Sequence, residues 1–287
     1  MSLTKVLIIG FGSLGRWHLK GLELARLDLQ VDVVDPDSRA LKSGVDFIER
    51  IISPSLAAKV KKWQSLEDCL SESNSHFELA IVSTCAPGRI DVVESLVKSC
   101  LVKHFIIEKP IETSALNIRK MRGLLAGKSA FLNLPRRLMP WQKQIKQSIS
   151  RIGILRCSVK YQQLAIACNA SHFIDLVNWW TGQLPLSVCL KENNSSWHPS
   201  KRDGYWDFFG EASIQFDGGA SLTLMSLNNS VQNTITLESA AEESCVINEE
   251  QGIAEFGSGN AIYGENLPQS KLSGLVLESL MDLGTCD

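Results

Sequence analysis

The sequence predicts an α/β protein in two parts, a doubly wound parallel sheet followed by an α+β domain with an open, mostly antiparallel sheet. Three observations predict this fold class: a glycine-rich loop directly after the first apolar strand, alternating strands and helices through the first half, and consecutive hairpins in the second half. The length of 287 residues suits one large domain or two ordinary ones. We expect the domains to comprise residues 1–120 and 121–287.

Five short apolar runs in the first half are typical of strands buried on both faces of a helix-covered parallel sheet. They are residues 5–9, 31–34, 78–83, 104–107 and 130–134. The segments between them show helical spacing, as Val93, Leu96 and Val97 do within 89–99. The expected helices begin at residue 14 and then cover 41–50, 65–70, 89–99 and 114–125. This alternation predicts parallel strands joined by right-handed crossovers.

The second half has a different texture. We expect a strand at 154–162 and a helix at 170–180, after which almost every segment is typical of a strand. Asp217-Gly218-Gly219 joins two strand-like runs as a hairpin turn does. Residues 245–248 and 252–256 predict a second hairpin. Consecutive hairpins indicate an antiparallel sheet.

Composition and charge argue against several classes of partner. Hydrophobic residues make up 44% and charged residues 21% of the chain, close to a globular average. The net charge of −2 gives no support to a nucleic-acid or anionic-membrane partner. No apolar stretch approaches the roughly 20 residues of a spanning helix. The eight cysteines include no C-x-x-C pair, and no His, Asp and Glu cluster has metal spacing, so we predict reduced thiols, a cytoplasmic location and no metal.

The glycine-rich loop Gly10-Phe-Gly12-Ser-Leu-Gly15 follows a buried-type strand and opens a helix, which is the context of a dinucleotide site in a Rossmann domain. Gly10 allows the tight turn, Gly12 lets the backbone approach a pyrophosphate, and Gly15 lets helix and strand pack closely. The pyrophosphate would bind the N–H groups of the helix start, at Ser13 and Leu14. The alternative is a glycine-rich turn without a ligand.

Two strand ends carry further candidates for cofactor contact. Asp35 ends the second strand, near the offset at which a carboxylate binds an adenosine ribose and repels a 2′-phosphate, which favours NAD over NADP. Arg39 lies close in sequence and could grip that phosphate instead, so NADP stays possible. Thr84 ends the next predicted strand and is a candidate for nicotinamide or ribose contact. The alternative reading makes Asp35 and Thr84 ordinary strand-end residues.

Four segments together carry a family resemblance: Gly10 to His18, the Glu108-Lys109-Pro110 signature after a strand, the pattern H-x-x-D-x-x-x-W-x-x-G at 172–182, and residues 133–140. Taken in chain order, the four segments resemble the glucose–fructose oxidoreductase / inositol dehydrogenase family over nearly the whole chain. The resemblance implies an NAD(P)-binding Rossmann domain and a second domain for substrate binding and oligomerisation. It also implies hydride transfer to or from a sugar, sugar acid or nucleotide sugar, and a homodimer or homotetramer.

The resemblance and the chemistry agree on the catalytic candidates. Lys109 follows a strand's carboxyl end, where open α/β sheets bind ligands, and an ammonium group there can hold a reacting oxygen. Histidine side chains ordinarily titrate near neutral pH, which makes His172 the candidate for proton transfer. Asp175, three residues later on the same helix face, is expected to contact a substrate hydroxyl or the imidazole. Glu108 is expected to help bind the cofactor and, with Pro110, to fix the Lys109 backbone.

Two further observations bear on the substrate. Arg136 and Arg137 follow a strand and precede a helix, where a guanidinium could bind a carboxylate or a nucleotide-sugar phosphate, or simply lie on the surface. Sugar-oxidising members of the family usually carry a carboxylate four residues before the histidine, and here that residue is Cys168. The departure leaves open an imine or tetrapyrrole-type reductase, and a catalytically silent dinucleotide-sensing regulatory or scaffold protein.

The end of the chain also departs from the family pattern. Residues 269–286 resemble the penultimate helix of sugar-acting members, which continue into another helix, whereas this sequence stops at Asp287.

Overall fold

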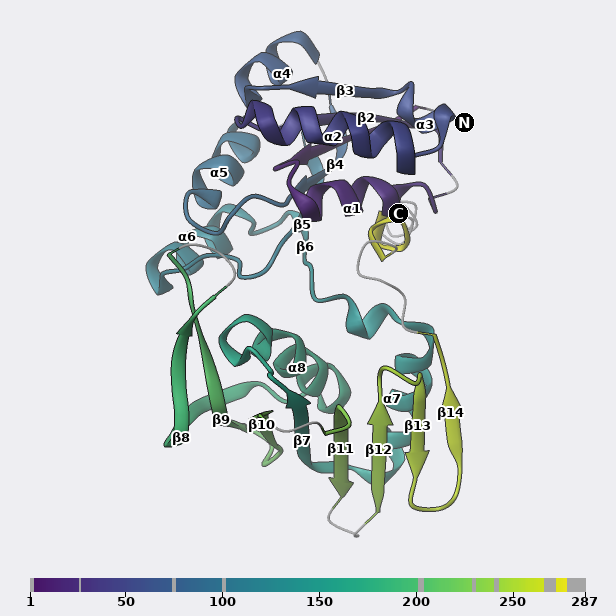
Figure 1. Cartoon of the computed structure of the whole chain (residues 1–287), viewed down its shortest axis with the longest axis vertical. Helices are drawn as coiled ribbons and strands as arrows, with labels where there is room; N and C mark the ends of the chain where they lie inside the picture. The colour runs from purple at the N-terminus through teal and green to yellow at the C-terminus, as the bar shows by residue number, and fades with distance from the viewer. Residues whose placement is uncertain are drawn as a thin grey trace. The chain divides into compact units, whose positions relative to one another are not determined.

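A computed structural model describes residues 3–25, 27–73, 76–99, 102–200, 204–228, 231–239, 243–265 and 272–277 (Figure 1). The chain divides into two compact units. The first unit extends to Asn133 and includes the helical residues 272–277, and the second unit runs from Leu134 to residue 265. The expected boundary at residue 120 therefore shifts, because the strand at 129–132 pairs with the first sheet.

The first unit contains the predicted parallel sheet, with strand order β3-β2-β1-β4-β5-β6. The strands are β1 (Thr4–Ile9), β2 (Leu29–Val34), β3 (Val60–Trp63), β4 (Phe77–Val82), β5 (Val102–Ile107) and β6 (Ser129–Leu132). The helices are α1 (Ser13–Leu22), α2 (Ser38–Ile51), α3 (Pro54–Ala57), α4 (Leu66–Ser73), α5 (Arg89–Ser99) and α6 (Ala115–Leu124). The α/β prediction is thus confirmed for this unit.

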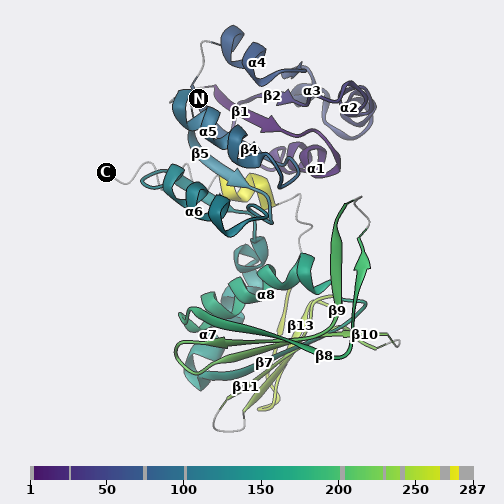
Figure 2. The same cartoon turned by 90° about the vertical axis from the view of Figure 1, so that its left-hand side faces the viewer.

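The strand order places a topological switch between β1 and β4. From β1 the chain builds outward through β2 and β3, and it then crosses to build β4, β5 and β6 on the other side. Helices cover both faces (Figure 2), which is why the central strands are buried almost without interruption. Open α/β sheets bind ligands beside the carboxyl ends of the strands at such a switch.

Residues 272–277 complete the first unit from the far end of the sequence. Leu272 and Leu277 are fully buried, and a Cβ on Gly274 would lie 2.5 Å from the Gly21 carbonyl oxygen on α1. Glycine therefore permits close packing against α1. The rest of the helix expected at 269–286 lies outside the described residues.

The second unit contains an eight-stranded sheet in the order β14-β13-β12-β11-β7-β10-β9-β8. Its strands are β7 (Ile154–Gln162), β8 (Pro185–Pro199), β9 (Trp206–Phe216), β10 (Ser221–Leu227), β11 (Thr234–Ser239), β12 (Ser244–Asn248), β13 (Ile253–Phe256) and β14 (Ala261–Tyr263). Among the described strand pairs of this second sheet, only β7–β10 is parallel, and both predicted hairpins, β9–β10 and β12–β13, are antiparallel. The prediction of a mostly antiparallel sheet is confirmed.

Two helices lie over one face of this sheet (Figure 2), namely α7 (Pro140–Ile152) and α8 (Ile166–Thr181), preceded by the short 3₁₀-helix η1 (Pro135–Leu138). Phe173, Leu176 and Val177 of α8 are buried, as are Ile214 and Leu224 of the sheet. The core of the second unit therefore lies between the helices and one sheet face.

In the ranges given above, no helix is long and apolar enough to cross a membrane. Nor does this part of the chain contain three or more His, Cys, Asp or Glu side chains grouped to hold a metal ion. The absence of a metal from the active protein stays a prediction.

Candidate functional site

The glycine loop joins β1 to α1 at the switch point, and its three glycines differ in their surroundings. Gly10 has φ of +89°, a conformation that L side chains rarely adopt. A Cβ on Gly15 would collide with the Gly10 carbonyl, whereas a Cβ on Gly12 would meet no atom within 4 Å. Gly10 and Gly15 are thus required by the fold itself, and Gly12 faces open space.

The start of α1 is arranged for an anion. Gly12 is the N-cap, no side chain caps the helix, and the first turn holds no acidic residue. The first N–H groups of a helix have no carbonyl partner within the helix and lie at its positive end. Together with the opening at Gly12, the N–H groups of Ser13 and Leu14 could receive a pyrophosphate.

Asp35 lies beside this loop, directly after β2. Its Oδ2 accepts a hydrogen bond of 2.7 Å from the Phe11 N–H, and its Oδ1 accepts one of 2.9 Å from the Asp37 N–H. Arg39 is exposed and donates from Nε and Nη2 to the two Asp37 oxygens, each at 3.1 Å. These hydrogen bonds hold the pKa of Asp37 below its usual range. A phosphate bound by Arg39 would have to compete with Asp37.

Thr84 follows β4 at the same edge of the sheet. Its Oγ1 is buried and has no hydrogen-bond partner among the described residues. The neighbouring Ser83 donates from Oγ to the Gly10 carbonyl at 2.7 Å, which ties the end of β4 to the glycine loop. A buried hydroxyl without a partner costs free energy unless a ligand or water satisfies it.

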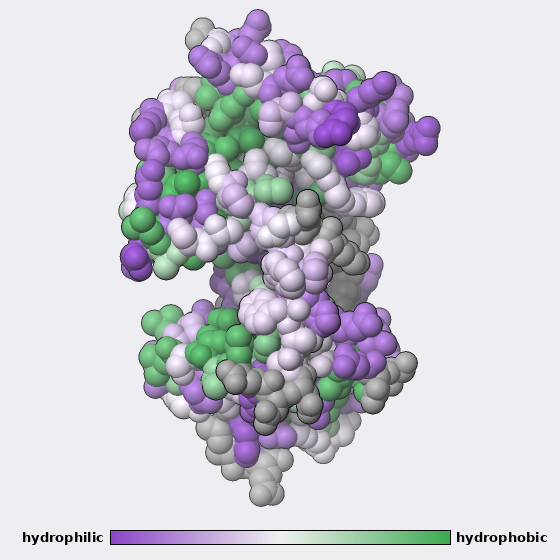
Figure 3. Space-filling view, turned by 60° about the vertical axis from the view of Figure 1, so that its left-hand side comes forward, coloured by the Kyte–Doolittle hydropathy of each residue, from purple (hydrophilic) through white to green (hydrophobic). Residues whose placement is uncertain are grey.

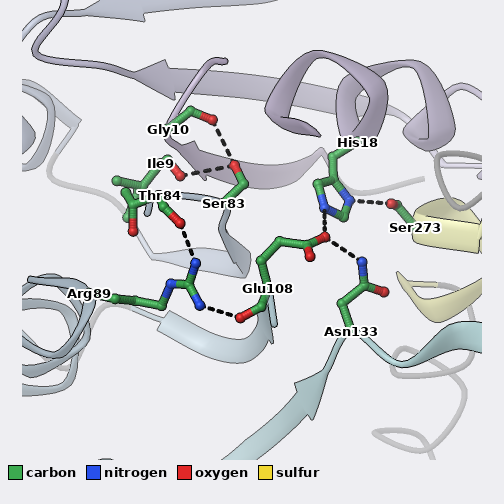
Figure 4. A network of polar contacts seen from close by, with 9 residues as sticks. All are labelled: Ile9, Gly10, His18, Ser83, Thr84, Arg89, Glu108, Asn133 and Ser273. Carbon is green, nitrogen blue, oxygen red and sulfur yellow. Dashed lines mark hydrogen bonds and ion pairs between the residues drawn. The ribbon is translucent and has the colours of Figure 1, made fainter. Parts of the chain in front are cut away.

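Glu108 follows β5 and is nearly fully buried in a network of the first unit (Figure 4). Its Oε1 accepts from His18 Nε2 at 2.8 Å and from Asn133 Nδ2 at 2.5 Å, and His18 Nδ1 contacts Ser273 Oγ. The carboxylate thus connects α1, the ends of β5 and β6, and residues 272–277. Glu108 therefore holds these segments of the first unit together. A contact between Glu108 and the cofactor stays a prediction.

The same network sets the charge state of Glu108. Burial raises the pKa of this carboxyl, but hydrogen bonds from His18 and Asn133 and the charge of Arg89 outweigh burial and hold the pKa below its ordinary value. A carboxyl with a lowered pKa stabilises the fold above the pKa of the unfolded chain. That stabilisation is lost as the pH falls through the folded-state pKa.

Lys109 follows Glu108 and is half-buried, and its peptide bond to Pro110 is cis. Because β4 and β5 are parallel neighbours, Thr84 and Lys109 lie at the carboxyl edge that also carries the glycine loop. The first unit therefore brings together Gly12, Asp35, Thr84 and Lys109 along one sheet edge.

In the second unit, His172 lies in the second turn of α8 and is 6% exposed. The helix begins four residues before the predicted start at 170. Asp175 is half-buried, and its Oδ1 lies 3.6 Å from Arg137 Nη1. Burial raises the pKa of Asp175, and the Arg137 charge lowers it in part. Arg137 thus adjoins the predicted catalytic helix, while a contact of Asp175 with substrate or imidazole stays a prediction.

Arg136 is engaged inside the second unit. Its Nε and Nη2 donate to the two Glu249 oxygens at 2.9 and 3.0 Å, and its guanidinium lies 4.7 Å above the Phe173 ring. Tyr161 donates its hydroxyl to Glu249 Oε2 at 2.6 Å, and burial together with the Glu249 charge raises the pKa of Tyr161. Arg136 therefore has an internal partner that a substrate anion would have to displace.

A carboxylate that the sequence analysis missed lies at the start of α8. Asp207, near the beginning of β9, is 5% exposed, and its Oδ1 accepts from the Cys168 N–H at 3.3 Å. Cys168 is exposed and precedes His172 by about one helical turn of ~5.4 Å. The fold thus supplies a carboxylate beside Cys168 from a distant strand.

Comparison with known proteins gives a fold match without a sequence match. No protein-family model and no curated protein matches the sequence. A biliverdin reductase from Synechocystis sp. PCC 6803, solved with biliverdin and NADP+, matches with a TM-score of 0.73 at 14% identity, over 98% of this chain and 90% of its own. A UDP-N-acetylglucosamine 3-dehydrogenase from Acidithiobacillus ferrooxidans matches with a TM-score of 0.72 at 13% identity, over 100% and 91%.

A myo-inositol 2-dehydrogenase from Lactobacillus plantarum also matches, with a TM-score of 0.66 at 14% identity, over 98% of this chain and 89% of that one. The chain has the fold of these oxidoreductases. At such identities the likeness is one of fold alone. The fold that the sequence resemblance implied thus agrees with the fold found by comparison, and the parallel sheet and the mostly antiparallel sheet are both present here.

Within this fold, the candidate residues fall into two groups. The glycine loop, Asp35, Thr84, Glu108 and Lys109 belong to the first unit, and His172, Asp175, Arg136 and Arg137 belong to the second. The sequence does not predict the hydrogen-bonding roles of five further residues, because their partners are distant in the chain. These residues are His18, Asn133, Asp207, Tyr161 and Glu249.

Proposed function

We propose that this protein is an NAD(P)-dependent oxidoreductase that transfers a hydride to or from a sugar, sugar acid or nucleotide sugar. One observation carries the proposal: Gly12 leaves an opening at the start of α1, at the switch point of a sheet with the strand order of dinucleotide-binding domains. Solved structures of the same fold support it, since one was crystallised with NADP+ and another with NAD+.

The residues at this edge fit a dinucleotide. The opening at Gly12 and the first turn of α1 would hold the pyrophosphate, Asp35 the adenosine ribose, and the unsatisfied Thr84 hydroxyl the nicotinamide end. When bound, the nicotinamide ring supplies or accepts the hydride.

The chain's own residues would manage the reacting oxygen. Lys109 would hold that oxygen and stabilise its developing negative charge, and His172 would donate or remove the proton. Asp175 would orient a substrate hydroxyl or the imidazole, and Arg137 would bind an anionic part of the substrate.

Reduction of a double bond, as in an imine or a tetrapyrrole, is the second candidate. The observation that favours it is the exposed thiol of Cys168 one turn before His172, where a carboxylate would assist alcohol oxidation. Biliverdin with NADPH, followed by the pigment's absorbance, tests it directly. Nucleotide binding without turnover of biliverdin, sugars, sugar acids or nucleotide sugars would instead favour a dinucleotide-sensing regulatory protein.

The experiment that tests the cofactor site is the Gly12→Val substitution. A Cβ at this position meets no protein atom within 4 Å, so thermal stability should stay nearly unchanged, but the valine side chain fills the space needed by the pyrophosphate. We expect NADH affinity, measured by nicotinamide fluorescence, to fall by about 100-fold, or about 2.8 kcal/mol. Gly123→Val on α6 is the matched control, because a Cβ there also meets no atom within 4 Å. Unchanged NADH binding in Gly12→Val would contradict the proposed site.

Asp35 provides a separate prediction about cofactor choice. We expect the wild type to bind NADH more tightly than NADPH, because the carboxylate accepts ribose hydroxyls and repels a 2′-phosphate. Asp35→Asn removes the charge while keeping the side-chain shape. It should lower the ratio of the NADPH dissociation constant to the NADH dissociation constant about tenfold, or about 1.4 kcal/mol. Asp28→Asn is the control, because Asp28 directly precedes β2, at the end of the strand opposite Asp35. A ratio that Asp35→Asn leaves unchanged would argue against a ribose contact.

We further propose a homodimer or homotetramer. The edge strand β8 exposes Leu186, Val188 and Leu190 by 70%, 61% and 41%, and an uncovered apolar edge strand favours pairing with another chain. Figure 3 shows hydrophobic residues in separate patches among hydrophilic ones. Sedimentation should give a dimer or larger, and Val188→Lys should shift it toward the monomer. A monomeric wild type would refute this part of the proposal.

A further inference from the structure

Arg89, the first residue of α5, carries its guanidinium into the interior of the first unit and is 2% exposed. Its Nη2 donates to the Thr84 carbonyl, and its Nη1 donates to the carbonyls of both Glu108 and Pro110 (Figure 4 draws the first two of these acceptors). One buried side chain therefore spans the backbone at the ends of β4 and β5.

This is an unfavourable place for a cation unless the contacts offset the cost. A buried guanidinium loses its hydration, and the start of a helix is the positive end of the helix dipole. Two buried carboxyl groups lie near: the Arg89 charge helps lower the pKa of Glu108, and Glu112 Oε1 accepts from the Ile90 N–H at 3.3 Å. The carbonyl contacts and these charges together compensate the buried cation.

The three carbonyls lie where the sheet ladder stops. β4 and β5 remain paired up to Val82 and Ile107, and the Glu108 N–H donates to the Val82 carbonyl at 3.0 Å. Beyond that bond, the Arg89 side chain connects the two strand ends, because it donates to the carbonyls of Thr84 and Glu108. The carbonyls on either side of Lys109, those of residues 108 and 110, are held by the same nitrogen atom.

We propose that Arg89 is a positioning residue that orients Lys109, and with it Thr84, for the reaction. The Glu108 carbonyl belongs to the peptide that precedes Lys109, and the Pro110 carbonyl belongs to the peptide that follows Pro110. Holding both carbonyls, with the φ of Pro110 set by its ring, restrains the backbone around Lys109 and so the direction in which its side chain leaves the backbone. This inference rests on the proposed function for the chemical role of Lys109, but the coupling between Arg89 and Lys109 can be measured without a substrate.

The test measures the reactivity of Lys109 toward a water-soluble acetylating N-hydroxysuccinimide ester at fixed pH, by mass spectrometry of its peptide. Exposed Lys61 and Lys62 on β3 are the internal references. Arg89→Met removes all donors at similar length, and we expect the Lys109 labelling rate to change about fivefold or more, or about 1 kcal/mol, with the reference rates unchanged. In Arg89→Ala, added methylguanidinium should return the rate toward the wild-type value.

Val93→Ala is the matched control, because Val93 is fully buried on the same helix and only packing is lost. It should leave Lys109 labelling at the wild-type rate. Should Arg89→Met fail to fold, Arg89→Lys carries the comparison, since an ammonium group keeps the charge but cannot span three carbonyls as a planar fork does. A wild-type labelling rate in the folded Arg89 variant would overturn the inference.

The nucleotide titration keeps this test separate from the proposed function. If the wild type binds neither NADH nor NADPH, the proposed function fails, and the labelling comparison still decides whether Arg89 orients Lys109. If the wild type binds NADH and labelling does not respond to Arg89, the positioning role fails alone.

Discussion

Lys109→Ala should lower kcat/KM by about 10²–10⁴-fold while the dissociation constant of NADH stays within about twofold of wild type. The expected loss is that of a group that holds the reacting oxygen and shares its proton. The assay uses the best substrate from a screen of sugars, sugar acids and nucleotide sugars. Lys103→Ala is the control, because Lys103 is an exposed lysine of β5, the strand that precedes Lys109, and it pairs with Glu78 at 2.8 Å. Retained turnover in Lys109→Ala would remove Lys109 from the chemistry.

His172→Ala should cause a loss of similar size, with exposed His198 as the control position. The double variant Lys109→Ala/His172→Ala carries the decisive information. Two groups that act on one oxygen give strongly non-additive losses, so the double variant should be little worse than the poorer single variant. Losses that multiply would show that the two side chains act independently.

Arg136→Met should lower the free energy of unfolding by about 3–5 kcal/mol, because it leaves the Glu249 carboxylate buried without its guanidinium partner. The Tyr161 hydroxyl is a neutral donor and replaces little of the lost charge compensation. Urea unfolding measures the effect. The double variant Arg136→Met/Glu249→Met should recover much of the loss, since it removes the orphaned charge as well.

Arg156→Met is the matched control for this prediction. Arg156 pairs with Glu238 at 3.4 Å on adjacent strands of the same sheet, but both side chains are more than half exposed. Exposed pairs contribute about 0–1 kcal/mol, so this variant should unfold nearly as the wild type does. Equal losses at the two positions would contradict a special role for the buried pair. A small loss in Arg136→Met would free Arg136 for the substrate role that the sequence suggested.

The parts of the structure that sequence predicted well depend on local patterns. The glycine loop, the β9–β10 turn and α5 all follow from residues close in the chain, and their structural expectations are confirmed. The strand β3 was missed because Val60–Trp63 is short and carries two exposed lysines. The start of α8 was placed too late because its N-cap is Ala165, which has no capping side chain.

The candidate site was harder to predict because its interactions join distant residues. The sequence predicts Arg136 as a substrate ligand. It does not predict the pairing of Arg136 with Glu249, because the two residues are 113 positions apart in the chain. The sequence predicts Glu108 as a cofactor ligand, and it does not predict the hydrogen bonds that its carboxylate accepts from His18 and Asn133. Arg89 and Asp207 gave no signal, because a buried charge is recognised by its surroundings rather than by its neighbours in sequence.

The packing of residues 272–277 against α1 has a consequence for the order of folding. During synthesis, the first 133 residues leave the ribosome long before the segment that buries Leu272 and Leu277 and brings Ser273 to His18. The first unit is therefore assembled from two segments of the chain, with the second unit translated between them. The burial of Leu272 and Leu277 must wait until that segment has been translated, and a nascent chain stalled before residue 272 would carry the glycine loop on a unit that lacks it.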